Sequence, residues 1–230
     1  MSHGVEPFDV VGGALVNADS LPYVREGVHI AVVDPGVGTE RRALAVEDAS
    51  GRIHVGPDNG LLMPAIERFG GGRDAVALSV DPHLASATFH GRDVFAPAAA
   101  RIAAGAELGE LGETVGVGSL TVLPSIDAEV GAGRLESAAV LVDWFGNVAL
   151  HTGPGALEEA GLRAGDTVLV IAADRETRAR VGDTFSSVPS GEPLVYQDSF
   201  GRVAIAVREA SATRTLALRR GERVTIQRTT

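Results

Sequence analysis

The segment Val28-His29-Ile30-Ala31-Val32-Val33-Asp34-Pro35-Gly36 decides the fold of the first half of this 230-residue chain. Residues 28–33 are nearly all apolar, which is the pattern of a short strand buried on both faces of a sheet. The strand ends at Asp34, and a proline and a glycine then turn the chain. Open α/β sheets bind ligands in the crevice at the carboxyl ends of their strands. The segment therefore predicts an α/β domain with a candidate site at Asp34.

Helices and strands alternate on both sides of this segment. The pattern predicts a helix over 11–18 between Asp9 and Leu21-Pro22, a hairpin of 43–46 and 53–55 turned at Ser50-Gly51, a helix over 61–69 capped by Asp58 or Asn59 and closed by Gly70, a strand over 75–80, and a helix over 94–102. We expect a sandwich-like α/β domain with a mainly parallel sheet over residues 1–125.

The second half reads as all-β. Short β-type runs cover 138–142, 168–171, 194–196, 203–207 and 223–226, and turn signals rich in glycine separate them. Many short strands at such intervals are typical of a small barrel or sandwich. We expect a β-barrel domain over residues 126–230.

The composition excludes several function classes. The chain has 20 basic and 30 acidic side chains, a net charge of −10, so we expect no nucleic-acid partner. It has no cysteine, which excludes thiol nucleophiles and thiolate metal sites. No apolar run approaches the roughly 20 residues of a membrane span, and the first residues do not show the basic-then-apolar pattern expected of a signal peptide. We expect a soluble, cytoplasmic protein without a membrane partner.

The first candidate site is the loop from Asp34 to Arg42. Two glycines expose backbone amides beside the carboxylate, and Arg41 lies seven residues further on, close enough to fold back and keep Asp34 ionised. A plain turn with a surface ion pair is an alternative. A phosphate-binding nest with Arg41 and Arg42 is another, although neither common phosphate-loop pattern is present.

The second candidate is the segment Thr88-Phe89-His90-Gly91-Arg92-Asp93 at the start of a predicted helix. His90 is the best general-base candidate, because an unperturbed imidazole titrates nearest neutrality. A structural His90 with Asp93 as a helix N-cap is the alternative. A metal site of Asp34, His90 and Asp93 is possible in principle, but no metal-ligand spacing supports it. His29 and His54 lie within apolar strands and are expected to be structural.

The third candidate is Asp143-Trp144-Phe145-Gly146-Asn147, which holds the only tryptophan of the chain. Adjacent aromatic rings beside an amide suit a flat heterocycle. A hairpin turn with Phe145 in the core is the alternative. Asp198-Ser199-Phe200-Gly201 repeats the pattern of acid, aromatic and glycine, and two such turns in one domain favour a ligand.

Taken together, six ordered segments resemble the S-adenosyl-L-methionine (SAM) hydroxide adenosyltransferases, which are adenosine-forming hydrolases related to fluorinase and chlorinase. The segments are residues 2–10, 33–39, 55–62, 88–93, 143–147 and 198–202. The family's catalytic Asp, Arg and His fall on Asp34, Arg41 and His90. The resemblance implies attack of water at the ribose C5′ of SAM, with release of methionine and adenosine and with no cofactor and no metal. Asp34 would orient the water, and His90 would accept or relay its proton.

The resemblance also implies a substrate pocket. Asp143 would hold the methionine ammonium, and Asn147 with the backbone near Glu209 and Ala210 would meet adenine. Apolar walls would come from Phe8, Trp144, Phe145 and Phe200, and Val37, Phe89 and Ser199 would line the pocket near the ribose or methionine. Gly91 stands where the halogenating relatives present a serine, which favours water over halide as the nucleophile. The family forms trimers with sites between subunits, so a homotrimer is expected.

Relatives begin with a strand that ends in an aspartate for the ribose hydroxyls, followed by a helix. Neither has a counterpart here, and we expect that the 230-residue form begins downstream of them. This departure motivates a different function, that of a non-catalytic binder of adenosine or SAM. Two more functions fit the same residues, namely a halide-using enzyme of this family and a metal-dependent hydrolase built on Asp34, His90 and Asp93.

Overall fold

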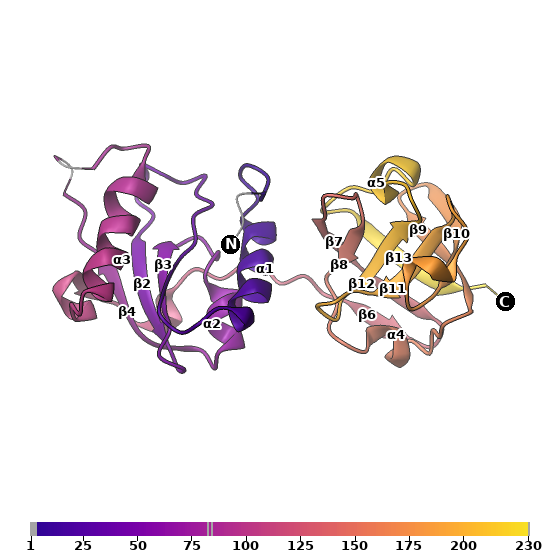
Figure 1. Ribbon diagram of the computed structural model, residues 1–230, viewed down its shortest axis with the longest axis horizontal. Helices are drawn as coiled ribbons and strands as arrows, with labels where there is room; N and C mark the ends of the chain where they lie inside the picture. Colours follow the sequence, from indigo (N-terminus) through magenta and orange to yellow (C-terminus); the bar gives the residue numbers. More distant parts are fainter. Residues whose placement is uncertain (1–3, 82, 84, 230) are drawn as a thin grey trace. The chain divides into compact units, whose positions relative to one another are not determined.

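The computed structural model describes residues 4–81, 83 and 85–229. The chain divides into two compact units, residues 1–124 and 125–230, each with its own hydrophobic core (Figure 1). Ser2 and His3, the first residues of the N-terminal motif, lie outside the described residues.

The first unit is built on a five-stranded sheet of order β1-β3-β2-β4-β5. The strands are β1 (Val28–Ile30), β2 (Ala43–Asp48), β3 (Ile53–Pro57), β4 (Gly72–Leu78) and β5 (Gly112–Thr114). Only β1 and β3 pair in parallel, whereas β2 pairs antiparallel with β3 and β4, and β4 with β5. The expected parallel sheet is thus confirmed for one pair alone. The short turn at Ser50-Gly51 explains the antiparallel pairing of β2 with β3, because a tight hairpin can join only antiparallel strands.

Strand β1 is also shorter and more exposed than its apolar run predicts. It ends at Ile30, although the Ala31 amide still donates to the Val55 carbonyl at 3.0 Å. Ile30 and Val32 are 38% and 44% exposed, so the expectation of burial on both faces is wrong. In the described sheet β1 is the end strand and has β3 as its neighbour on one side.

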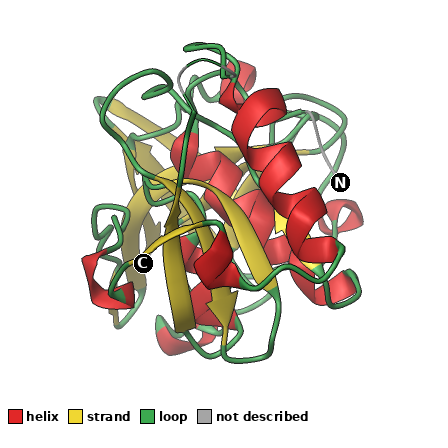
Figure 2. Ribbon diagram, turned by 90° about the vertical axis from the view of Figure 1, so that its left-hand side faces the viewer, coloured by secondary structure: helices red, strands yellow, loops and turns green. Residues whose placement is uncertain are grey.

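Helices cover both faces of the sheet (Figures 1 and 2). The helices are α1 (Val10–Ser20), α2 (Met63–Arg68) and α3 (Ala96–Ala103). Alternation along β2 explains the layers, because successive strand residues point to opposite faces. Ala43 and Ala45 lie in one core cluster with Phe95, next to α3, whereas Leu44 and Val46 lie in another with Ile66 of α2.

The two predicted helix caps have different outcomes. Asp9 caps α1, and its Oδ1 accepts the Gly12 amide at 2.7 Å. Helix α2 begins only at Met63, and neither Asp58 nor Asn59 caps it. Both of these side chains bond to the segments around Asp34 and Arg42 instead.

Short helical turns connect these elements. They are η1 (Leu21–Tyr23), η3 (Leu108–Glu110) and η4 (Val117–Ser119), with a π-helical turn, η2 (Gly91–Phe95), that runs into α3; a further turn, η5 (Phe185–Ser187), lies in the second unit. π-Helical turns occur frequently at functional sites.

The second unit is a closed barrel of seven strands, as expected. Its strands are β7 (Arg134–Val142), β8 (Val148–Leu150), β9 (Thr167–Ala172), β10 (Arg175–Val181), β11 (Pro193–Gln197), β12 (Val203–Val207) and β13 (Arg223–Arg228). Pairing of β13 with both β9 and β7 closes the barrel, and β6 (Glu129–Gly131) adds to β7 outside it. Two short helices, α4 (Ala156–Glu159) and α5 (Ala212–Thr215), complete the unit.

Among the described residues, none of the helices has the length and hydrophobicity that crossing a bilayer requires.

Candidate active site

The loop after β1 folds back on itself and brings Arg41 onto Asp34. The Arg41 Nε donates to both carboxylate oxygens of Asp34 at 3.0 Å, and Nη2 donates to Oδ2 as well. The two side chains are only 10% and 5% exposed. The alternative of a plain surface ion pair is therefore wrong, because the pair is buried and its fork geometry fixes the orientation of the carboxylate.

His90 reaches the same guanidinium from a segment 49 residues further along the chain. Its Nδ1 lies 2.9 Å from the Arg41 Nη2. Because a guanidinium can only donate, Nδ1 is the acceptor in this contact. The structure thus brings together the predicted Asp34, Arg41 and His90, with Arg41 between the other two.

A buried aromatic ring supports this arrangement. The Arg41 guanidinium carbon lies 5.3 Å from the centre of the Phe95 ring, within cation–π range. Phe95 is fully buried at the end of the π-helical turn that follows His90. The sequence does not single out Phe95, since an apolar residue in a helix carries no signal of a contact with a distant arginine.

Gly38 allows the two loops to meet. It has a φ of +79°, and a Cβ at this position would lie 2.7 Å from the Ala87 carbonyl oxygen. Only glycine fits a positive φ and such a close backbone approach without strain. The Asp34 loop and the segment that leads into His90 therefore pack backbone against backbone.

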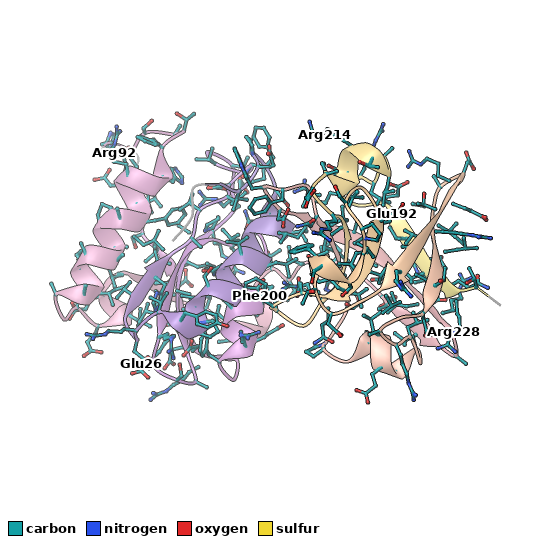
Figure 3. All side chains as sticks on the ribbon, turned by 45° about the vertical axis from the view of Figure 1, so that its right-hand side comes forward. Glu26, Arg92, Glu192, Phe200, Arg214 and Arg228 are labelled. Carbon is teal, nitrogen blue, oxygen red and sulfur yellow. The ribbon has the colours of Figure 1, made fainter. Side chains whose placement is uncertain are left out.

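Asp93 does not join the cluster. Its carboxylate bonds to the Arg92 side chain and accepts the Ser86 amide at 2.9 Å, and the hydrogen bonds from Arg92 lower the pKa of Asp93 to about 2. Arg92 itself lies at the surface, at the start of the helix in Figure 3, and its guanidinium lies 4.5 Å from the centre of the Phe89 ring. Within the described part of the chain, no cluster of His, Asp and Glu has the arrangement of a metal site.

A cavity of about 560 Å³ opens beside Asp34. Its walls come from the N-terminal segment, from α1 and from the residues that follow β1, and they include Val5, Glu6, Pro7, Phe8, Val16, Asn17, Ile30, Val32, Val33 and Leu61. Phe8 is 78% exposed and has a φ of +67°, which is costly for a bulky residue. Strain of this kind gathers at functional sites.

In the barrel unit, the turn between β7 and β8 presents two aromatic rings to solvent. Asp143 Oδ1 accepts the amides of Phe145 and Asn147 at 2.9 and 2.8 Å, and its Oδ2 accepts the Asn147 side-chain amide at 2.7 Å. Trp144 is 97% exposed and Phe145 is exposed as well, so the alternative with Phe145 in the core is wrong.

The turn between β11 and β12 repeats this geometry. Asp198 Oδ1 accepts the amides of Phe200 and Arg202 at 2.8 and 2.9 Å, and Phe200, labelled in Figure 3, is half exposed. Burial, together with the charges of Asp143 and Asp198, raises the pKa of Tyr196 to about 12. Tyr196 in β11 therefore lies within the field of both turns.

The remaining predicted pocket residues are Glu209, Ala210, Gly91, Val37 and Ser199, and the structure places each of them as follows. Glu209 has a φ of +59°, and its carboxylate accepts the Ser190 hydroxyl at 2.7 Å. The Ala210 amide donates to the Val207 carbonyl at 3.1 Å. A Cβ at Gly91 would meet open space, so the backbone there leaves room for a serine. Val37 lies in the Asp34 loop and Ser199 in the β11–β12 turn.

His29 and His54 are buried away from this cluster, as expected of structural histidines. His54 Nε2 bonds to Asp48 Oδ2 at 2.8 Å, and the ring centres of the two histidines are 6.1 Å apart. Burial lowers the pKa of both histidines.

An α/β unit with an Asp–Arg–His cluster, followed by a small barrel with exposed aromatic turns, defines the class of this protein. The model of the SAM hydroxide adenosyltransferase N-terminal domain matches residues 1–112, and the model of the C-terminal domain of that family matches residues 138–225. The chain therefore belongs to the SAM hydroxide adenosyltransferase family.

Individual relatives agree with this assignment. The chain is 43% identical to the (R)-S-adenosyl-L-methionine hydrolase of Salinispora tropica over 98% of its length and 84% of that protein. It is 26% identical to the fluorinase of Actinopolyspora mzabensis, over 98% of this chain and 85% of the fluorinase. A solved structure of an uncharacterized conserved protein from Thermotoga maritima is 32% identical and superposes with a TM-score of 0.85, covering 99% of this chain and 87% of that one.

Proposed function

We propose that this protein hydrolyses SAM to adenosine and L-methionine. The observation that carries the proposal is the partly buried cluster of Asp34, Arg41 and His90, in which one guanidinium contacts both a carboxylate and an imidazole. The family membership and the hydrolase of Salinispora tropica name the reaction that such a cluster would serve.

The cluster supplies what attack by water requires. Water is a poor nucleophile, and a positioned base contributes about 10²–10⁴ in rate. Asp34, held by Arg41, orients the water, and His90 accepts or relays its proton at Nδ1, the ring nitrogen that accepts from Arg41 before the transfer. The water oxygen forms a bond to C5′ as the C5′–S bond breaks, and the electron pair of that bond passes to sulfur, which leaves as the neutral thioether of methionine. Approach of an anionic oxygen to a cationic sulfonium cancels charge, so a dry site favours the transition state.

Water is favoured over halide and over binding without turnover. All three residues of the cluster are present and in contact, whereas a halide needs small hydroxyl and backbone donors, and Gly91 offers no hydroxyl. The identity to the hydrolase is 43%, against 26% to the fluorinase. A protein that only binds SAM has no need of an imidazole held next to the carboxylate by a shared arginine.

The substrate pocket belongs to this proposal. Asp143 binds the methionine ammonium, and Asn147 with the backbone of Glu209 and Ala210 binds adenine. Val37, Phe89, Gly91 and Ser199 lie near the ribose or methionine, with apolar walls from Phe8, Trp144, Phe145 and Phe200. No cofactor or metal takes part, and the working form is a homotrimer with its sites at the subunit interfaces. The exposure of Trp144 and Phe145 supports the aromatic walls, because such rings gain most when a ligand covers them.

The test is chromatography of SAM incubated with the purified full-length protein. The expected result is adenosine and methionine in equal amounts, with product formation strongly reduced in His90→Ala. Tight binding by calorimetry with no turnover, identical in both proteins, would establish a binder instead. Light scattering at matched concentrations tests the trimer, and a monomer with full activity contradicts it.

A further inference from the structure

Asp58 and Asn59, which follow β3, have side chains that the proposed chemistry leaves without a role. The sequence predicts them as caps of α2, but that helix begins at Met63 and neither side chain reaches it. Asp58 is 9% exposed as a whole residue and belongs to the buried polar groups of the chain. Buried polar groups need partners, and the partners of this pair lie next to the catalytic cluster.

Asn59 holds the chain just before Asp34. Its Nδ2 donates to the Val33 carbonyl at 2.8 Å, and its Oδ1 accepts the Leu61 amide at 3.1 Å. Both ends of the amide are therefore engaged, which fixes which end is nitrogen. The Val33 carbonyl belongs to the peptide that enters Asp34, so this bond fixes the point from which the catalytic carboxylate projects.

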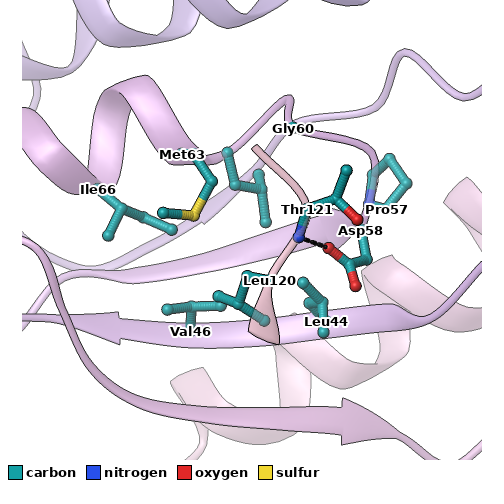
Figure 4. Close-up of a pocket in the computed structure, with 10 residues that line it drawn as sticks. Leu44, Val46, Pro57, Asp58, Gly60, Met63, Ile66, Leu120 and Thr121 are labelled. Atoms are coloured by element: carbon teal, nitrogen blue, oxygen red, sulfur yellow. Dashed lines mark hydrogen bonds between the residues drawn. The ribbon is translucent and has the colours of Figure 1, made fainter. Parts of the chain in front are cut away.

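Asp58 holds the chain just after Arg41. Its Oδ2 accepts the Arg42 Nε at 2.7 Å, and its own amide donates to the Arg42 carbonyl at 2.9 Å. The other carboxylate oxygen accepts the Thr121 amide at 2.7 Å, the contact drawn as a dashed line in Figure 4. Arg42 in turn donates to the Ser119 carbonyl at 2.6 Å, so the carboxylate ties the loop end to the segment around residues 119–121.

Gly60 keeps this pair of side chains in place. It has a φ of +92°, and a Cβ there would lie 3.0 Å from the Leu123 amide nitrogen. A positive φ turns the chain sharply from Asn59 into Leu61. The turn lets Asn59 bond to Leu61 while its amide still faces Val33.

We propose that Asp58 and Asn59 are positioning residues that clamp the two ends of the Asp34–Arg41 loop. Asn59 fixes the entry at Val33, Asp58 fixes the exit at Arg42, and the catalytic pair lies between the two anchors. The inference rests on the proposed function, because the clamp matters only if Asp34 and Arg41 must be held in position for SAM hydrolysis. A misplacement of about 1 Å costs on the order of 10² in rate, so loss of either anchor lowers turnover without removing a group that touches the substrate.

The test compares Asn59→Asp and Asp58→Asn with the control Asp48→Asn. Asp48 is a buried carboxylate of the same sheet that bonds to Ser50 and His54, away from the loop. Asn59→Asp keeps the shape of the side chain but replaces the donor facing Val33 with an oxygen. We expect kcat for adenosine formation to fall at least about tenfold in both clamp variants, with KM within about twofold of wild type. Asp48→Asn is expected to lower the thermal midpoint and to keep kcat.

A readout without turnover separates the clamp from the proposed function. The chain has six histidines, and His90→Gln assigns the Hε1 proton resonance of His90 in the NMR spectrum. This resonance is expected to move in Asn59→Asp and Asp58→Asn and to stay in place in Asp48→Asn. If the wild type forms no adenosine, the proposed function fails while this shift still tests the clamp. Clamp variants that keep both kcat and the His90 resonance overturn the inference, and Asn59→Ser serves the same comparison if Asn59→Asp does not fold.

Discussion

Replacing Arg41 by lysine tests whether the catalytic cluster depends on the geometry of the guanidinium or only on its charge. Arg41 uses Nε and Nη2 on Asp34 and, from the same Nη2, contacts the His90 Nδ1 at 2.9 Å. A lysine carries one nitrogen on a flexible stem, so it can meet Asp34 but cannot hold both groups in one plane. The charge beside the buried carboxylate is kept.

The expected loss follows from these contacts. With the carboxylate and the imidazole no longer held together, kcat should fall about 10²–10³-fold, which is about 2.7–4 kcal/mol of transition-state stabilisation at 1.36 kcal/mol per factor of ten. KM should change by less than about threefold, because Arg41 binds no part of the substrate in the proposed mechanism. The unfolding free energy should fall by only about 1–2 kcal/mol, from the lost charged hydrogen bond and the lost contact with Phe95.

Arg52→Lys is the matched control. The Arg52 guanidinium lies 4.1 Å from the centre of the Phe69 ring, its side chain is 12% exposed, and it donates to the Ser50 hydroxyl at 2.8 Å, away from Asp34. Adenosine formation under saturating SAM and urea unfolding should be measured for both variants. Arg41→Lys with more than one third of wild-type kcat, or Arg52→Lys with an equal loss, would refute the reasoning.

Three further predictions concern other groups. His90→Gln can still accept from Arg41, so it should fold normally while kcat falls about 10²–10⁴-fold; unchanged turnover contradicts the role of His90 in proton transfer. Burial lowers the pKa of His29 and His54, so protons bind the unfolded chain first as the pH drops. The stability from the two neutral histidines should be complete above about pH 6.5 and should be lost as the pH falls through the folded-state pKa values, by at most about 1.4 kcal/mol per pH unit for each; a flat plot of unfolding free energy between pH 7.5 and 5 is inconsistent with this. Burial and the charges of Asp143 and Asp198 raise the pKa of Tyr196 to about 12. The phenolate absorbance of Tyr196, taken as the difference between wild type and Tyr196→Phe, should therefore titrate with a midpoint near pH 12. A midpoint near the usual value of about 10 contradicts the burial of Tyr196 near the two carboxylates.

Local signals in the sequence predict much of the fold. Asp9 caps its helix and Ser50-Gly51 turns its hairpin, because both act through neighbours within a few residues. The barrel strand β10 is not predicted, since its sequence Arg-Glu-Thr-Arg-Ala-Arg-Val carries charge on the solvent side and little apolar alternation. The antiparallel pairing of β4 with β2 and with β5 is set by which strands meet in space, and the pattern of a single strand does not predict it.

In the candidate site, too, the sequence predicts some residues, whereas other contacts are visible only in the tertiary structure. Asp34 and His90 stand out by residue type at the ends of predicted elements, and the resemblance to a known family joins them with Arg41. The contact of Arg41 with Phe95 and the bond of Asn59 to Val33 join residues far apart in the chain. Asp58 and Asn59 look like helix caps in sequence because caps and the clamp use the same short polar side chains, and only the tertiary structure distinguishes the two roles.

The central claim, that water is the nucleophile that breaks the C5′–S bond of SAM, is tested most directly by isotope labelling. The purified protein is incubated with SAM in H₂¹⁸O, with and without added halide, and the nucleoside product is analysed by mass spectrometry. Attack by water is expected to give adenosine that carries one ¹⁸O atom at C5′ under both conditions. Formation of a 5′-halogenated nucleoside, or adenosine without the label, would contradict it.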